Sequence, residues 1–146
     1  MAVKPFRRFL ALPATERRLL VGAVSALSLV RCGLGFLRLR RLRRLLSRLG
    51  TARPTHLASS SPARIGWAVE LVGRYMPIRP ATCLEQGLAV QFLLARHGYP
   101  ARLHIGVARF GGGGMQAHAW VDSGGAVVIG DSPVLGRFVT LTVLEP

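Results

Sequence analysis

The chain has 146 residues, half of them hydrophobic, and a formal net charge of +14. This length allows one domain with its own core, and the presence of only two cysteines excludes a small disulfide-stabilised fold and favours a reduced, cytoplasmic protein. The charge is uneven, because residues 1–50 hold twelve Lys and Arg side chains and one acid, whereas residues 51–146 hold eight and five. Such a basic N-terminal region is expected to attract an acidic partner or an anionic surface.

The first long apolar segment is predicted to be a helix that starts at Pro13. Leu19–Val30 is uncharged and mostly apolar, and it lies between Arg17–Arg18 and Arg31. A membrane span needs about twenty apolar residues. The segment is shorter than this and has basic residues on both sides, so we expect a buried or interfacial helix rather than a span or a cleavable signal.

A second basic helix is predicted over 37–49, because four leucines recur there at helical spacing. These are Leu39, Leu42, Leu46 and Leu49, and arginines occupy most of the remaining positions. Two interpretations stay open: a helix packed on its own domain with a solvated basic face, or a docking face for a partner or a membrane surface. No aromatic residues alternate with these arginines, so nucleic acid is the partner that the pattern favours least.

The remainder of the chain predicts an α+β domain. Residues 1–50 form the basic helical region, 51–61 a linker and 62–146 the core, whose first helix starts at Ser61–Pro62. A second helix is expected from Thr82 to Gly98. Strand patterns follow over 101–109, 115–122, 126–131 and 137–144, which indicates a helix packed on a small antiparallel sheet.

Cys83 is the candidate nucleophile, because it lies in the first turn of that second helix. Unpaired backbone N–H groups favour an anion there, so they stabilise a thiolate and can hold an oxyanion, with the Cys83 N–H as one donor. Gln86 lies one turn further on and is the candidate second donor. Taken alone, Cys83 also fits a small buried residue, and Gln86 a surface amide.

His118 and Asp131 are the candidate base and its orienting carboxylate. If Gly124–Gly125 form the two-residue turn of a hairpin, Val121 faces Val128 and His118 faces Asp131. Side chains that face each other directly have Cβ atoms about 4.5–5.5 Å apart, which suits a carboxylate that binds an imidazole N–H. A register different by one residue would turn Asp131 to the other face.

The other titratable residues are assigned no catalytic role. Asp122 is the rival carboxylate, but it lies about 13 Å from His118 along the same strand. His104 fits a structural histidine in a strand, and Cys32 fits an apolar helix. The histidines and cysteines show no metal-ligand spacing, so no metal and no cofactor are predicted.

The order Cys, His, Asp from helix to sheet resembles the transglutaminase-like and papain-like superfamily. A more specific similarity is carried by R-R-F-L-A-L-P-A-T-E-R-R-L-L near the start, by C-L-E-Q-G-L-A-V-Q-F-L-L-A-R-H-G-Y-P-A-R-L-H-I-G-V-A, and by Q-A-H-A-W-V-D. Together they resemble the leader peptidase of lasso-peptide biosynthesis, the protease half of the split B protein. The sequence departs from that family at Gly87, where Ser is common, and at Asp122, which replaces a frequent Glu.

The resemblance implies a bacterial cytoplasmic cysteine endopeptidase with a transglutaminase/papain-like core. Such an enzyme cuts a ribosomally made precursor peptide between leader and core through a Cys83–His118–Asp131 triad. It also implies a separate leader-recognition protein and an ATP-dependent macrolactam synthetase as partners. Two alternatives stay open: acyl transfer to an amine, as in transglutaminases, and a non-catalytic scaffold that binds a partner or a membrane through residues 1–50.

Overall fold

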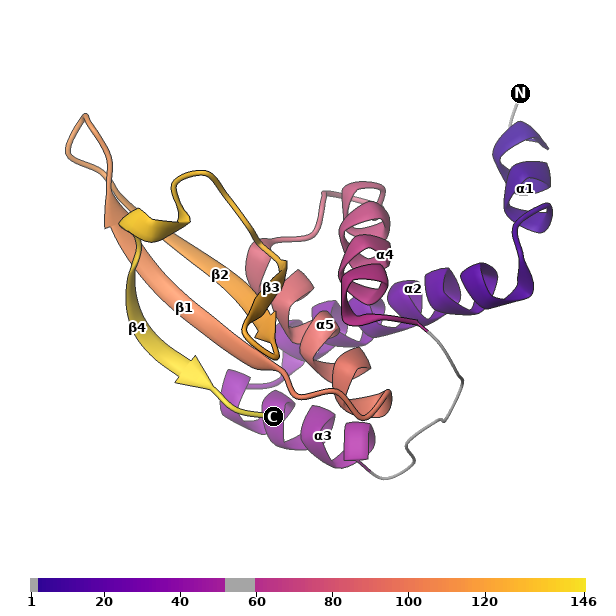
Figure 1. Ribbon diagram of the computed structural model, residues 1–146, viewed down its shortest axis with the longest axis horizontal. Helices are drawn as coiled ribbons and strands as arrows, with labels where there is room; N and C mark the ends of the chain where they lie inside the picture. The colour runs from indigo at the N-terminus through magenta and orange to yellow at the C-terminus, as the bar shows by residue number, and fades with distance from the viewer. Residues whose placement is uncertain (1–2, 52–59) are drawn as a thin grey trace.

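The computed structural model describes residues 3–51 and 60–146, which form one antiparallel sheet with helices packed on one side of it (Figure 1). The helices are α1 (Val3–Leu10), α2 (Ala14–Phe36), α3 (Leu39–Thr51), α4 (Pro62–Arg74) and α5 (Cys83–Arg96). The strands are β1 (Arg102–Arg109), β2 (Met115–Ser123), β3 (Ala126–Ile129) and β4 (Val139–Leu144), and a short 3₁₀ turn, Leu135–Arg137, precedes β4. The predicted α+β class is therefore confirmed.

The sheet has the order β3-β2-β1-β4, and every neighbouring pair is antiparallel. Its inner face packs against α5, and Leu103 and Val121 from this face are fully buried. Gly87 lets α5 approach the sheet closely, because a Cβ atom at this position would lie 2.6 Å from Cδ1 of Leu103. Close packing thus explains a glycine at this position.

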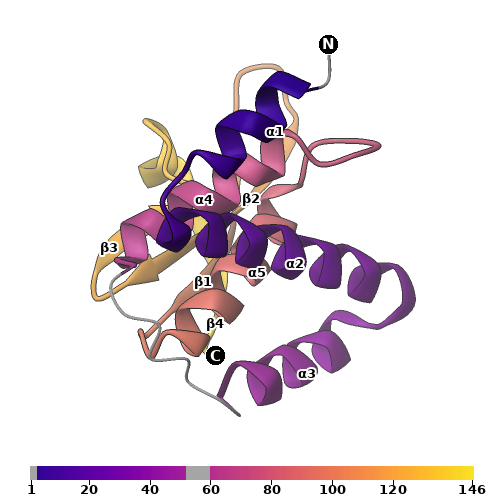
Figure 2. The same cartoon turned by 90° about the vertical axis from the view of Figure 1, so that its right-hand side faces the viewer.

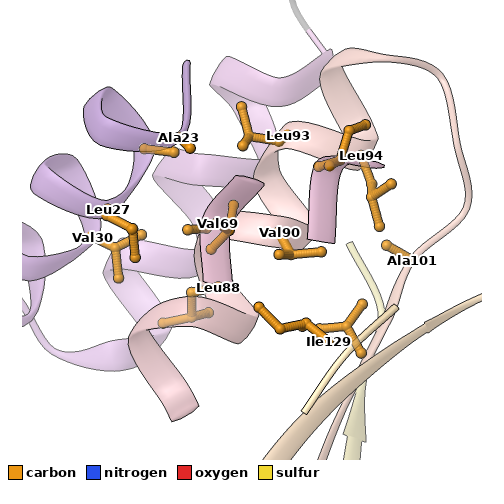
Figure 3. Packing of buried hydrophobic residues seen from close by; sticks show 14 of the residues in the cluster. Ala23, Leu27, Val30, Val69, Leu88, Val90, Leu93, Leu94, Ala101 and Ile129 are labelled. Atoms are coloured by element: carbon orange, nitrogen blue, oxygen red, sulfur yellow. The ribbon is translucent and has the colours of Figure 1, made fainter. Parts of the chain in front are cut away.

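One hydrophobic core joins the basic N-terminal helices to the rest of the chain (Figure 3). Leu27 of α2, Leu42 of α3, Val69 of α4 and Leu88 of α5 are each at most 1% exposed and belong to this core. Residues 52–59 of the predicted linker lie outside the described residues, and the helices on both sides of them share that core. Among the described helices, α2 has the length and apolar composition of a membrane span, but its inner side is buried here.

The local signals for helix ends are confirmed. The hydroxyl of Ser61 accepts a hydrogen bond from the Arg64 N–H at the start of α4. At the start of α5, Thr82 and Glu85 form a capping box, in which each side chain accepts from the backbone N–H of the other residue. Gly98 adopts a φ of 77° just after α5, which ends the helix as expected.

The leucines of α3 recur at helical spacing, as predicted, but they differ in burial. Leu42, Leu46 and Gly50 form the buried row of α3, whereas Leu49 is exposed. The reason is the close packing at Gly50, where a Cβ atom would lie 3.2 Å from the Cβ of Ala95 on α5. Because Gly50 has no side chain, its face of α3 packs closely against α5, and Leu49 points toward solvent.

Gly66 provides a stability test of the contact between α4 and β3. A Cβ atom at Gly66 would lie 2.0 Å from the backbone oxygen of Val128, so Gly66→Ala must displace α4 or the sheet edge. We expect a loss of about 1–3 kcal/mol in the free energy of unfolding, measured by urea denaturation. Gly22→Ala in α2 is the matched control: its Cβ meets only a Leu93 methyl at 3.8 Å, so helix propensity predicts a gain of up to about 1 kcal/mol.

Candidate active site

A cleft between α4, α5 and the β2–β3 edge brings the predicted site residues together. It has a volume of ≈ 330 Å³, and its lining includes Cys83, Gln86, His118 and Asp131. These four residues come from α5, β2 and the segment after β3, so the fold places them around one cleft although they span almost fifty positions of the chain. Their catalytic roles stay predictions.

Cys83 is the first residue of α5 and is half-buried. The first N–H groups of a helix have no acceptor within the helix, so those of Cys83 and Leu84 are available to a negatively charged group. The capping box holds this turn in shape, because the Thr82 hydroxyl accepts from the Glu85 N–H at 3.2 Å. The thiol is therefore presented to the cleft from a fixed helix start.

A buried ionic cluster around Glu85 holds this helix start in place. The Glu85 carboxylate accepts from the Thr82 N–H at 2.8 Å, from Arg79 at 2.9 and 3.0 Å, and from Arg31 of α2 at 3.3 Å. Burial acts to raise the pKa of Glu85, but the hydrogen bonds from Arg79, Arg31 and Thr82 outweigh it and lower the pKa from 4.5 to about 2. The carboxylate is thus charged at neutral pH.

Arg31 extends this cluster to the loop before α5. Its guanidinium also donates to the backbone oxygens of Pro77 and Arg79 at 3.0 and 3.1 Å. One side chain of α2 therefore fixes both the proline-containing loop and the helix that carries Cys83.

His118 lies on β2, and its ring is anchored by a backbone carbonyl. Its Nε2 is 2.7 Å from the oxygen of Gly130. A carbonyl oxygen can only accept, so Nε2 carries the hydrogen and Nδ1 is the unprotonated nitrogen of the neutral ring. Trp120 and Phe138 pack against the imidazole, with ring centroids 6.1 and 5.3 Å away. In the neutral ring, Nδ1 is therefore the nitrogen that can accept a proton.

The predicted register of the hairpin is wrong beyond its first pairs. Ser123 does face Ala126, but Val121 pairs with Ile129 instead of Val128, because the register shifts between Val121 and Asp122. The bulged strand presents the Val128 carbonyl to Gly66 of α4, and β3 ends at Ile129.

As a result of this shift, the backbone of Gly130 meets His118 where the Asp131 carboxylate was expected. Gly130 has a φ of 81°, and its missing side chain allows close contact with the backbone of Trp120. The Asp131 carboxylate instead accepts from the Ser132 N–H at 2.8 Å, although Asp131 still lines the cleft.

Two expected contacts of the site are not formed. Within residues 3–51 and 60–146, no hydrogen bond joins Cys83 to His118 or His118 to Asp131. Gln86 donates one amide hydrogen to the backbone oxygen of Ala81 at 3.0 Å. This bond holds the amide beside the helix start, and its second hydrogen remains for a ligand.

The rival carboxylate Asp122 belongs to a separate pair on the outer face of the sheet. It contacts Nε2 of His104 at 2.5 Å and Arg102 at 3.2 Å. The His104 ring stacks on Trp120, with centroids 5.3 Å apart and planes 6° from parallel. Trp120 thus separates this pair from His118, and the pair has the satisfied contacts that were expected of a structural histidine.

Sequence reasoning missed three features that shape the cleft: Glu70, Arg74 and the Gly130 carbonyl. Glu70 and Arg74 form an exposed ion pair of 2.6 Å at i, i+4 spacing on α4. That spacing was visible in the sequence, whereas the carbonyl contact depends on the bulge. In the part of the chain that the structure describes, no group of three His, Cys, Asp or Glu side chains could hold a metal ion.

Comparison with known proteins gives one match. A family model described as Transglutaminase-like superfamily matches residues 26–143, a segment that begins in α2 and ends in β4. No curated protein and no solved structure matches the chain.

Proposed function

The chain belongs to the transglutaminase-like superfamily, and from this premise we propose that it is a cysteine peptidase that removes the leader from a lasso-peptide precursor. The observation that carries the proposal is the arrangement of Cys83, at the start of α5, and His118, on β2, around one cleft. The specific substrate rests on the resemblance of the segments around these two residues to the leader peptidases.

The reaction follows from the chemistry of these groups. Nδ1 of His118 takes the proton of Cys83, and the sulfur attacks the scissile carbonyl carbon. The oxyanion is held by the Cys83 N–H, with Gln86 as the candidate second donor. His118 then gives its proton to the leaving amine, so that the C–N bond breaks and a thioester remains. His118 next activates water, which hydrolyses the thioester and releases the carboxylic acid and the thiol.

Asp131 is the proposed carboxylate of the triad. In this proposal the Asp131 carboxylate, which lines the same cleft and now accepts from the Ser132 N–H, replaces the Gly130 carbonyl as the partner of His118. A carboxylate stabilises the imidazolium formed after proton transfer better than a neutral carbonyl does. In this proposal the precursor is presented by a separate leader-recognition protein, and the core peptide passes to an ATP-dependent macrolactam synthetase in the cytoplasm.

The test is cleavage of a candidate precursor peptide. The full chain is incubated with the precursor and its recognition protein, and the products are identified by mass spectrometry. We expect cleavage at one bond, which Cys83→Ala abolishes and Cys32→Ala leaves intact, because Cys32 is an exposed residue of α2 outside the cleft. Intact peptide with all partners present would contradict the proposal, as would full cleavage by Cys83→Ala.

Acyl transfer to an amine is the second candidate, because the family description fits both chemistries. The two share the thioester and differ in the group that attacks it. Adding a small primary amine separates them: a peptidase mainly gives the free acid, whereas a transferase mainly gives the amide, and the two products differ in mass.

A further inference from the structure

The outer side of α2 carries a long exposed stripe without charge. The outer stripe consists of Val21, Val24, Ser25, Ser28, Cys32 and Phe36, all of which are exposed. Their spacing of three or four residues places them on one face of the helix, over roughly 22 Å of its length. Phe36 is 89% and Val21 53% exposed, so apolar side chains dominate this surface.

The outer stripe is uncharged, because Arg31, the one charged residue between Leu19 and Phe36, does not belong to it. Its guanidinium turns inward to Glu85 and to the loop before α5, and its side chain is only 19% exposed. The only cation of the segment is therefore used inside the protein, and no charge within the stripe opposes contact with an apolar phase.

Arginines lie at both ends of the outer stripe. Arg18 is exposed near the start of α2, and four exposed arginines of α3 or the turn before it lie beyond its end: Arg38, Arg40, Arg41 and Arg44. Figure 2 shows α1, α2 and α3 together on one side of the molecule, in front of α4, α5 and the sheet. The helices that carry the apolar stripe and its basic ends thus lie on one side of the molecule.

We propose that this face binds the surface of an anionic lipid bilayer, with α2 lying in the plane of the interface. Exposed apolar side chains would enter the acyl boundary, while the arginines reach the headgroup phosphates. An acidic protein would match the arginines but would leave the stripe in need of an apolar partner. A bilayer with anionic lipids satisfies both.

The fold also determines how α2 meets the membrane. Ala23, Leu27 and Val30 on its inner side are at most 1% exposed within the core shared with α4 and α5. Drawing α2 across a bilayer would break that core, whereas surface binding leaves it intact. The helix therefore lies on the membrane and does not span it.

The test is flotation of the full chain with vesicles of phosphatidylcholine alone and of phosphatidylcholine with 30% phosphatidylglycerol. We expect at least tenfold tighter binding to the anionic vesicles at low salt. Each arginine near an anionic surface contributes about 1 kcal/mol, so Arg40→Gln with Arg44→Gln should weaken this binding by a factor of about 30. Val24→Asp with Phe36→Asp should weaken it by at least tenfold.

Leu141→Asp is the matched control, because Leu141 is an equally exposed apolar residue on β4, away from the stripe. It should bind vesicles as the parent chain does, and so should Cys83→Ala, since the inference does not depend on the proposed peptidase. Circular dichroism establishes that each variant is folded. A chain that binds neither vesicle, or whose Val24→Asp/Phe36→Asp variant binds fully, would overturn the proposal. It would also be overturned by binding of a soluble acidic peptide with no binding of vesicles.

Discussion

Replacing His118 with alanine is expected to reduce the rate of precursor cleavage by a factor of about 10³ or more. In the proposed mechanism, the imidazole takes the proton of Cys83 and returns it to the leaving amine. Its Nε2 is held by the Gly130 carbonyl at 2.7 Å, so the substitution removes a proton acceptor whose orientation is fixed. The rate is measured by single-turnover cleavage of the precursor, followed by mass spectrometry.

His97→Gln is the control for this prediction, since His97 lies at the end of α5 and does not line the cleft. Its activity should stay within twofold of the parent chain.

Asp131→Asn separates the two possible partners of His118. A tenfold or greater loss is expected if the carboxylate supports the imidazolium, whereas unchanged activity would mean that the Gly130 carbonyl alone orients the ring. Cleavage by His118→Ala at more than a tenth of the normal rate would place the base elsewhere.

Glu85→Gln is expected to cost about 3 kcal/mol of the free energy of unfolding at pH 7. The depression of the Glu85 pKa from 4.5 to about 2 corresponds to roughly this free energy. The carboxylate side chain is 4% exposed, so solvent screening is weak, and its loss leaves Arg31 without an anion. Urea denaturation measures the change, with Glu70→Gln as control: the exposed Glu70–Arg74 pair should contribute less than about 0.5 kcal/mol.

The same carboxylate predicts a pH dependence of stability. Because the pKa of Glu85 is lower in the folded chain than in the unfolded chain, the folded state binds fewer protons. The stabilisation is therefore complete above about pH 5 and is lost as the pH falls toward 2. Glu85→Gln should flatten this part of the stability curve. An equally steep acid loss in the variant would assign the effect to other carboxylates.

Local features of the fold were predictable because they depend on neighbouring residues. Ser61–Pro62, Thr82 and Gly98 set helix ends through bonds and φ values within a few positions. The Thr82-x-x-Glu85 pattern is also typical of a capping box, although only Thr82 was predicted as the cap. The four strands were predicted close to their observed bounds for the same reason, since alternation of side chains is a local property.

The features that were not predicted, or were predicted wrongly, arise where distant parts of the chain meet. Leu49 is exposed because Gly50 packs against α5, some forty-five residues along the chain. The hairpin register slips because β3 must place Val128 against Gly66, a contact that the turn sequence does not encode. The Arg31–Glu85 pair joins residues 54 positions apart. Sequence patterns therefore selected residues that line one cleft, but they did not predict the contacts that these residues make.

The position of Arg31 bears on how the protein can be divided. Its side chain extends from α2 to the loop before α5 and to Glu85 at the start of α5, next to Cys83. The N-terminal helices therefore help to hold Cys83 in position. A truncated version beginning at residue 62 would keep the residues that line the cleft, but it would lose Arg31 from the Glu85 carboxylate and from the loop before Cys83, leaving Arg79 and the Thr82 N–H as the partners of Glu85. Loss of activity in such a fragment would then be explained by the loss of this support, and it would not contradict the proposed roles of Cys83 and His118.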